Sequence, residues 1–428
     1  MTPRPHVFWY DQGTGLSSPL PPLSSDIRTD VVVVGGGIAG LTCAQALNEQ
    51  GRRVVLLEKD FCGSGASGRS SGFITPDSEM ELSSLVRSRG PERAKRLWDF
   101  VMSGVDSIRS NIEASGIDCD FQVQDSLFLA NSPKGMELVR REHDARTRVG
   151  YESTLHDATT IRSILGSDEC CGGVRYEGTF GINAFRYCQA MRDILRDAGV
   201  TIHEQSCVTE VADERVIANG FTVRADAVVL CVDRLLPEFG LVPSEVYRIQ
   251  TFLAISAPLT DVQISTIFPE SPLMVWDSDL IYQYFRLTGN RRLLLGASSL
   301  RYTYAVRHGE VIPGILDKMK AIVRGKFPGM KIDFEYFWPG LIGVSKDLLP
   351  LAARDTTHPT ISFVSGATGL AWAAALGRYM AEKLQSNRSD LDAEFDPDRH
   401  FVVGSALQRV IGKPAAFALS HGIVKLRR

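Results

Sequence analysis

The sequence predicts an α/β chain in which a doubly wound parallel sheet is interrupted by a second, β-rich domain. The first observation is the unbroken β-branched run Val31–Val34, which is typical of a strand buried on both faces of a parallel sheet. The second is a strand, glycine turn and helix over residues 361–384, which return to this pattern late in the chain. The third is a series of strand-like stretches between them, at residues 246–258, 281–287 and 292–299.

A glycine-rich turn follows the first strand. Gly35, Gly37 and Gly40 have the GxGxxG spacing, and residues 41–50 then have a helical pattern. In such a turn the first glycine permits a tight bend and the second lets the backbone approach a pyrophosphate. The third lets helix and strand pack closely. The helix N-terminus would face the phosphates.

The second strand of this motif, Val54–Leu57, ends at an acid. Glu58 stands where a carboxylate accepts hydrogen bonds from ribose hydroxyls. A turn that merely needs glycine would not explain this acid, so the motif predicts an adenine dinucleotide site. The residues expected to bind the dinucleotide here are Gly35, Gly37, Ile38, Ala39, Gly40, Glu58 and Lys59.

Composition excludes several classes of protein. The chain has 428 residues, 44% hydrophobic and 23% charged, with a net charge of −3, so it is an ordinary globular chain and no global field favours nucleic acid. Eight cysteines show neither CxxC nor Cys/His spacing, which predicts no metal site and a reducing, cytoplasmic setting. No apolar run reaches the roughly 18 residues that a spanning helix needs.

Helices are predicted at residues 88–115, 184–199 and 310–326, and strands at residues 216–223 and 225–232. The order of elements predicts a discontinuous layout, in which pieces of a dinucleotide domain enclose a β-rich domain. The predicted parts are an N-terminal arm (1–28), a cofactor domain (29–80, 165–236 and 337–386), a substrate domain (81–164 and 237–336) and a basic C-terminal tail (387–428).

A second glycine-rich segment, residues 63–72, follows the acid and reads Gly-Ser-Gly-Ala-Ser-Gly-Arg-Ser-Ser-Gly. Later blocks are Tyr284-Phe285-Arg286 with residues 292–296, and Trp338-Pro-Gly340 followed by Gly366 and Gly369. In this order, over about residues 28–386, they resemble the D-amino-acid-oxidase/glycine-oxidase superfamily of FAD enzymes. Within it, the Gly-Ala-Ser-Gly-Arg form most resembles gamma-glutamylputrescine oxidoreductase-like members.

The resemblance implies a Rossmann-like FAD-binding domain of the glutathione-reductase type. It also implies a discontinuous α+β substrate domain built on an antiparallel sheet. FAD would be held without a covalent bond, because no cysteine follows Cys231, whereas some relatives attach flavin through a cysteine near the last block. Further FAD contacts implied by the resemblance are Ala66, Ser67, Arg69, Ser70, Ser71, Gly72, Val208, Cys231, Gly340, Gly366, Thr368, Gly369 and Leu370.

Two departures from the family concern the substrate. Ile342 stands where glycine-oxidase-like members carry an arginine that holds the substrate carboxylate, and the loop of residues 366–369 lacks a second arginine. A guanidinium fork is the favoured partner of a carboxylate, so these losses argue against a plain α-amino acid. Arg286 is the best remaining carboxylate partner. Tyr284 could face the flavin or a neighbouring sheet, and Trp338 could form a pocket wall or belong to the core.

The prediction for function is FAD-dependent oxidation of a primary or secondary amine to an imine and then a carbonyl, with dioxygen as the acceptor and hydrogen peroxide as product. The substrate-side residues are Tyr284, Arg286, Trp338 and Ile342. A second hypothesis is a flavin dehydrogenase that passes electrons to quinone, docked on the inner membrane face by the basic segment 399–428; the same segment could instead pack on the body. An oxidase of an amino acid or 2-hydroxy acid and a non-catalytic dinucleotide-binding protein are also compatible with the dinucleotide motif.

Overall fold

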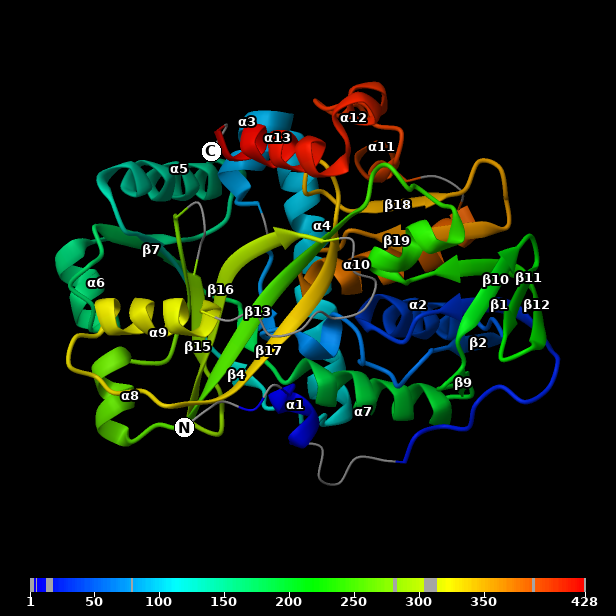
Figure 1. Cartoon of the computed structure of the whole chain (residues 1–428), viewed down its shortest axis with the longest axis horizontal. Coiled ribbons are helices and arrows are strands. Elements are labelled where there is room, and N and C mark those ends of the chain that lie inside the picture. Colours follow the sequence, from blue (N-terminus) through cyan, green and yellow to red (C-terminus); the bar gives the residue numbers. More distant parts are fainter. Residues whose placement is uncertain are drawn as a thin grey trace.

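Two large sheets stand side by side in the computed structural model, the first on the right of Figure 1 and the second on the left. The structure describes residues 4, 6–12, 18–77, 80–279, 283–303, 314–386 and 389–426. The chain crosses between the sheets several times, so neither sheet is formed by one continuous segment.

The first sheet contains the predicted parallel core. Its order is β10-β11-β12-β1-β2-β9, with β19 beside β12 and β18 beside β19. β12, β1, β2 and β9 run parallel, as do β12 and β19. This confirms the predicted α/β class. The strands are β1 (Ile27–Val34), β2 (Val54–Leu57), β9 (Thr201–His203), β10 (Val208–Ala212), β11 (Arg215–Ala218), β12 (Phe221–Leu230), β18 (Leu351–Arg354) and β19 (Ile361–Ser365).

Alternate side chains of β1 enter two different cores. Val31 and Val33 pack with residues of α2, α4, α7 and α10, whereas Val32 and Val34 pack with residues of β10 and β11. The β-branched run is therefore buried on both faces, which is why it shows no polar alternation. The covering helices are α2 (Ile38–Glu49), α4 (Pro91–Ser115), α7 (Ala184–Asp197) and α10 (Leu370–Ser386).

The second sheet is mostly antiparallel, in the order β17-β13-β16-β15-β14-β5-β7-β6. A small third sheet has the order β3-β8-β4. The strands of both are β3 (Phe73–Ile74), β4 (Gln122–Val123), β5 (Ser126–Ala130), β6 (Thr154–Asp157), β7 (Gly172–Tyr176), β8 (Phe180–Gly181), β13 (Tyr247–Pro258), β14 (Met274–Asp277), β15 (Gln283–Leu287), β16 (Arg292–Tyr302) and β17 (Phe334–Val344).

The remaining helices surround the second sheet and the chain ends. They are α1 (Phe8–Asp11), α3 (Leu82–Arg89), α5 (Pro133–Val149), α6 (Ala158–Leu165), α8 (Asp261–Ile267), α9 (Ile315–Lys326), α11 (Asp392–Phe395), α12 (Ser405–Ile411), α13 (Lys413–Leu426) and the short 3₁₀ turns η1 (Ser67–Arg69) and η2 (Asp233–Phe239).

One strand boundary differs from the prediction. The sequence predicts strands at 216–223 and 225–232, but β11 ends at Ala218 and β12 runs unbroken from Phe221 to Leu230. Asn219 and Gly220 form the turn between them, both with positive φ. An Asn-Gly pair is the preferred two-residue hairpin connection, so the sequence does carry the signal for this turn.

The predicted domain segments do not coincide with the two sheets. β7 lies in the second sheet, although the sequence assigns residues 165–236 to the cofactor domain. β17 lies there too, although the segment 337–386 begins within it. A buried strand looks alike in either sheet, so the pattern alone could not make this distinction. We propose that the chain passes from the substrate domain to the cofactor domain between β7 and β9, and again after β17.

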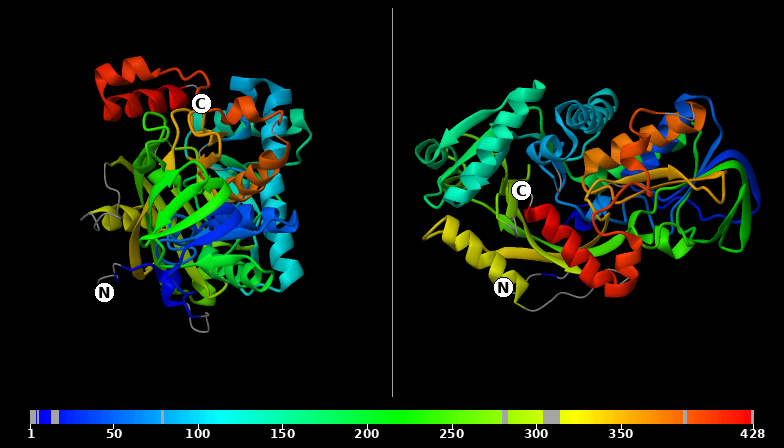
Figure 2. Two further views of the ribbon diagram at one scale, coloured as in Figure 1. Left: turned by 90° about the vertical axis from the view of Figure 1, so that its right-hand side faces the viewer. Right: turned by 90° about the horizontal axis from the view of Figure 1, so that it is seen from above.

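Both ends of the chain pack on the body. In the N-terminal arm, Phe8 and Trp9 are buried. In the C-terminal tail, α12 and α13 lie at the top edge of the molecule in the left view of Figure 2. The Tyr247 hydroxyl donates to Gln408 Oε1 at 2.7 Å, and the Tyr247 and Phe417 rings lie 5.4 Å apart. These contacts favour the packed form of the tail.

Candidate active site

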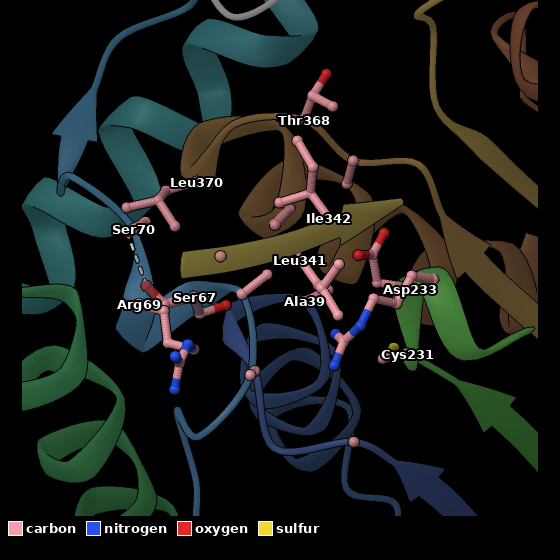
Figure 3. Close-up of a pocket in the computed structure, with 18 of the residues that line it drawn as sticks. Ala39, Ser67, Arg69, Ser70, Cys231, Asp233, Leu341, Ile342, Thr368 and Leu370 are labelled. Atoms are coloured by element: carbon pink, nitrogen blue, oxygen red, sulfur yellow. Dashed lines mark hydrogen bonds between the residues drawn. The ribbon is translucent and has the colours of Figure 1, made fainter. Parts of the chain in front are cut away.

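A cavity of about 540 Å³, which we name the central cavity, opens at the carboxyl ends of the parallel strands. Val34 and Leu57, the last residues of β1 and β2, line it, together with Cys231 just beyond β12. Figure 3 shows Ala39, Ser67 and Arg69, Cys231 and Asp233, and Leu341 and Ile342 of β17 around one space. Ligands of doubly wound sheets bind at this edge, so the position agrees with the predicted dinucleotide site.

The glycine turn forms one wall of the central cavity. Gly35 and Gly37 line it, and α2 begins at Ile38 with its N-terminus at the same place. Gly40 lies behind the turn, where a β-carbon would be 1.9 Å from the carbonyl oxygen of Gly35. The Ile38 amide donates to Ser67 Oγ at 3.1 Å and so joins the turn to the second glycine-rich segment. This bare backbone at a helix N-terminus suits a diphosphate.

Glu58 lies at the carboxyl end of β2 and is almost completely buried. Its Oε2 accepts from the Gly36 amide at 2.7 Å, and its Oε1 accepts from the Asp60 amide at 3.0 Å and from Ser64 Oγ at 3.2 Å. Burial raises the pKa of this carboxyl group, against the lowering effect of the amide hydrogen bonds. The acid therefore holds the glycine turn in shape and also lines the central cavity.

Two tryptophans fix the loop of residues 69–71. Trp338 Nε1 donates to the Arg69 carbonyl oxygen at 3.0 Å, and Trp9 Nε1 donates to the Ser70 carbonyl oxygen at 2.8 Å. The Arg69 guanidinium in turn donates to the Pro339 carbonyl oxygen at 2.9 and 3.2 Å. Trp338 is fully buried and is not a lining residue, so it takes the core position, not that of a pocket wall.

Arg286 fixes the next residue of this loop. Its Nε donates to the Ser71 carbonyl oxygen at 2.8 Å, its Nη2 to the Ile182 carbonyl oxygen at 2.7 Å and its Nη1 to the Leu287 carbonyl oxygen at 3.4 Å. The side chain has no exposed surface and does not line the cavity. Its prediction as a carboxylate partner therefore does not fit the structure, because backbone oxygens occupy the guanidinium group.

Asp233 connects three segments at the wall of the cavity. It has φ +48°, and its Oδ2 accepts from the Gly343 amide at 2.8 Å and its Oδ1 from the Gly366 amide at 3.2 Å. Ser365 Oγ donates to the Asp233 carbonyl oxygen at 3.0 Å. This single residue thus ties η2 to β17 and to the turn before α10, which is why distant blocks of the sequence meet.

Most of the predicted site residues meet around the central cavity. Those that line it are Gly35, Gly37, Ala39, Glu58, Lys59, Ala66, Ser67, Arg69, Ser70, Ser71, Val208, Cys231, Tyr284, Gly340, Ile342, Thr368, Gly369 and Leu370. Those that support the wall without lining it are Ile38, Gly40, Gly72, Arg286, Trp338 and Gly366.

A second part of the lining, from β14, β15 and the segment after β3, is acidic and aromatic. We name it the acidic side and define it by Asp77, Glu81, Trp276, Asp277 and Tyr284. Trp276 of β14 pairs across the sheet with Tyr284 of β15. Among the described residues that line the cavity, the lysine and the arginines belong to the loops around the glycine turn, and none belongs to this side. The same loops also contribute the acids Glu58, Asp233 and Glu238.

Asp277 is the most deeply buried acid of the acidic side. It has only 3% of its surface exposed, and its Oδ1 accepts from the Gln283 amide at 3.2 Å. Its Oδ2 has no hydrogen-bond partner among the described residues, although Lys326 Nζ lies 3.7 Å away. Burial raises the pKa of Asp277, and the nearby Lys326 opposes that rise. Lys326 thus supplies a cation to this buried oxygen, which still lacks a hydrogen bond among the described residues.

Asp77 belongs to a buried network behind the acidic side. Its two carboxylate oxygens each lie 3.2 Å from Arg146 Nη2, and the Tyr176 hydroxyl donates to its Oδ2. Arg146 Nε also donates to Glu142 Oε1 at 3.0 Å. With two acids for one arginine, this network adds negative potential when both carboxyl groups are ionised.

Several lining residues were missed by sequence reasoning. Asp77, Glu81, Trp276 and Asp277 stand in segments without a motif, and only the pairing of β14 with β5 and β15 carries Asp277 to the cavity. Arg234 and Asp233, soon after β12, did have a signal, because residues that follow a parallel strand at this edge meet ligands.

The fold and the site together define a two-sheet protein with a dinucleotide-type glycine turn at its central cavity, and comparison with known proteins identifies the family. The family "FAD dependent oxidoreductase", DAO, matches residues 30–383. The chain belongs to the DAO family of FAD-dependent oxidoreductases. It is therefore an FAD-dependent enzyme, as predicted, and the glycine cradle fits the diphosphate of that cofactor.

Individual relatives support this assignment. The chain is 27% identical to the probable oxidoreductase OrdL of Haemophilus influenzae, over 85% of this chain and 84% of the relative. It is 26% identical to gamma-glutamylputrescine oxidoreductase of Escherichia coli, over 90% of each chain. The crystal structure of glycine oxidase from Geobacillus kaustophilus superimposes with a TM-score of 0.74 at 19% identity, covering 88% of this chain and 100% of that chain, which shows a common fold.

The described part of the chain offers no candidate for a membrane span or a metal centre. No described helix combines the length and the apolar character that a membrane crossing requires. Within the same residues, no group of three or more His, Cys, Asp or Glu side chains is arranged for a metal ion.

Proposed function

We propose that this enzyme oxidises the C–N bond of an amine that carries a second cationic group, and that dioxygen is the electron acceptor. The observation that carries the proposal is that, among the described lining residues of the central cavity, the lysine and the arginines all lie in the loops around the glycine turn and none on the acidic side. These loops suit the anionic cofactor, whereas the acidic side offers carboxylates and aromatic rings. Aromatic faces and carboxylates are the groups that recognise ammonium ligands.

Bound FAD supplies a two-electron acceptor for the hydride on the carbon next to the nitrogen; the imine formed is then hydrolysed by water to a carbonyl. The protein has to hold the substrate so that this carbon faces the flavin. Asp277 Oδ2 would accept a hydrogen bond from the distant ammonium group, beside Lys326 Nζ at 3.7 Å. Trp276 and Tyr284 would form the walls along the carbon chain. The reacting nitrogen, away from this acid, then loses its proton more readily.

The acidic side also argues against acidic substrates. An α-amino acid or a 2-hydroxy acid carries a carboxylate, which would meet Asp77, Glu81 and Asp277. Ile342 lines the cavity at the place where relatives hold a carboxylate with arginine, and Arg286 is occupied elsewhere. Like charges at short range disfavour such a ligand.

A substrate screen tests the proposal. The purified enzyme is mixed anaerobically with diamines, matched monoamines of equal chain length, amino acids and 2-hydroxy acids, and flavin bleaching is followed by absorbance. Diamines should bleach the flavin fastest at equal concentration. Bleaching by 2-hydroxy acids alone would overturn the amine proposal.

Electron transfer to dioxygen is tested separately. Air-saturated reactions should form one hydrogen peroxide for each amine oxidised. Reduced enzyme that is stable in air but is reoxidised by a soluble quinone would favour the dehydrogenase hypothesis. In that case, removal of residues 400–428 decides whether the basic tail contributes membrane binding.

A further inference from the structure

Arg234 is a buried cation at the wall of the central cavity. It lies in η2, shortly after the end of β12, and only 5% of its surface is exposed. Its Nε has no hydrogen-bond partner among the described residues. A buried guanidinium nitrogen without an acceptor is costly, so this group calls for an anionic ligand.

The neighbouring charges are engaged elsewhere. The Asp233 carboxylate accepts from two backbone amides, at 2.8 and 3.2 Å, and Arg69 donates to the Pro339 carbonyl oxygen. Arg248 Nε donates to the carbonyl oxygen of Arg234 and its guanidinium pairs with Glu238. These contacts hold the backbone of η2, and Arg234 is among the residues that line the cavity.

The position of Arg234 indicates which anion it would bind. β12 runs parallel to β1 with Leu230 opposite Val34, so η2 and the glycine turn leave the sheet at the same edge. A β-carbon at Gly35 would lie 2.4 Å from the Cys231 carbonyl oxygen, which shows how closely the two segments approach. The glycine turn and the N-terminus of α2 are the place of the diphosphate in this type of domain.

We propose that the Arg234 guanidinium binds the diphosphate of FAD, as a side-chain ligand added to the backbone donors of the glycine turn. Arginine is the residue best suited to this role, because its planar fork forms paired hydrogen bonds with phosphate oxygens. The proposal rests on FAD binding by this family and is independent of the proposed amine chemistry.

The electrostatic surroundings agree with this role. Burial is the largest influence on the Arg234 guanidinium and lowers its pKa; the Asp233 carboxylate opposes this, and Arg248 and Arg69 add to the lowering. Without the cofactor the guanidinium therefore adds an unfavourable buried charge. The bound diphosphate would form an ion pair with the guanidinium and so offset the free energy of burying its charge.

Nucleotide titrations test the assignment. Apoprotein of full length is prepared for the wild type, Arg234→Gln and Arg234→Lys. As a control for the loss of one positive charge, Arg28→Gln changes an exposed arginine whose acid partner is 4.0 Å away. The probes are FAD, ADP, which keeps the diphosphate, and riboflavin, which lacks it. Arg234→Gln should weaken FAD and ADP by about 10- to 100-fold and leave riboflavin unchanged, with Arg234→Lys in between.

Stability separates a ligand from a merely structural residue. The apoprotein of Arg234→Gln should unfold at the same temperature as wild-type apoprotein or above it, because an unpaired buried charge is removed. FAD should raise the unfolding temperature less in the variant. Unchanged affinity for FAD and ADP would overturn the proposal, and so would an equal loss for riboflavin together with a less stable apoprotein.

A measurement on the holoenzyme covers the case in which the glutamine variant does not fold. In Arg234→Lys loaded with FAD, the phosphorus NMR resonances of the bound diphosphate should shift from their wild-type positions. Arg28→Gln should leave them in place. Identical spectra for Arg234→Lys and the wild type would overturn the proposal.

Discussion

The two sides of the central cavity each contain a deeply buried charged side chain, and the two are of opposite sign. On the glycine-turn side, Arg234 is buried and its Nε lacks a hydrogen-bond partner among the described residues; on the acidic side, the same holds for Asp277 and its Oδ2. Arg234 lies beyond the carboxyl end of β12 in the first sheet. Asp277 is the last residue of β14 in the second, mostly antiparallel sheet. The difference suggests separate duties: one side holds an anionic cofactor and the other side a cationic substrate.

The largest effect on stability is expected for Arg286, because it supports the wall shared by the two sides of the cavity. Arg286→Met removes a fully buried guanidinium that binds the carbonyl oxygens of Ser71, Ile182 and Leu287. Loss of these hydrogen bonds should lower the free energy of unfolding by about 3 kcal/mol. Denaturant unfolding measures it.

A matched control is Trp9→Phe, which removes one hydrogen bond to the same loop, at Ser70. It should cost about 1 kcal/mol. If Arg286→Met keeps its stability and instead loses activity only toward carboxylate-bearing substrates, Arg286 is a substrate ligand after all.

The glycine-turn side alone is disturbed by Gly40→Ala. The added methyl carbon would lie 1.9 Å from the carbonyl oxygen of Gly35, so the turn has to move. FAD affinity should fall by about 100-fold, near 2.7 kcal/mol, while the ranking of amines by the remaining holoenzyme stays the same.

Flavin fluorescence titration measures the affinity. Gly404→Ala serves as the control, because nothing lies within 4 Å of a β-carbon there. A changed order of amine preference in Gly40→Ala would break the separation of the two sides.

The acidic side alone is disturbed by Asp277→Asn. The variant should lower kcat/KM for diamines by about 30-fold, near 2 kcal/mol, with little effect on monoamines and none on FAD affinity. Its neighbour Asp279, which is exposed and accepts from Asn131, supplies the matched control Asp279→Asn.

A pH profile sharpens this test. Burial raises the pKa of Asp277, so its charged form, which attracts a cation, is lost as the pH falls through a value above the ordinary range of an aspartate. For diamines, kcat/KM should therefore decline on the acid side in wild type, and this limb should be absent from Asp277→Asn. An unchanged acid limb in the variant would assign the titration to another group.

The smallest effect is expected at the junction between the two glycine-rich segments. Ser67→Ala removes the acceptor of the Ile38 amide and should cost about 1 kcal/mol of FAD binding, roughly a fivefold weaker Kd. Isothermal titration of the apoprotein measures it, with Ser88→Ala, a serine on α3 that is not a lining residue, as control. A loss as large as that of Gly40→Ala would mean that Ser67 also binds the cofactor directly.

The cofactor half of the site could be predicted because its residues are close together in the sequence. Gly35, Gly37 and Glu58 belong to one strand–turn–helix–strand unit whose backbone geometry is local. The prediction of Thr368 and Leu370, which line the same cavity, required the family resemblance, since no local rule joins them to the first turn.

The substrate half could not be predicted in this way. Arg286 alternates with Tyr284 on one strand, but only packing decides that its guanidinium is occupied by carbonyl oxygens. Trp338 was undecided between wall and core for the same reason. Period-2 alternation gives the two faces of a strand and does not say what covers each face.

The sequence by itself determined the fold class, the dinucleotide turn and the family, because these depend on short-range patterns of glycine, β-branched and acidic residues. Only the tertiary structure decided which charges meet in the cavity. Arg234 and Asp277 are brought there by strand pairing between segments far apart in the chain. Burial then decides how much each charge matters, because a charged atom without a hydrogen bond is costly in free energy only where water cannot reach it.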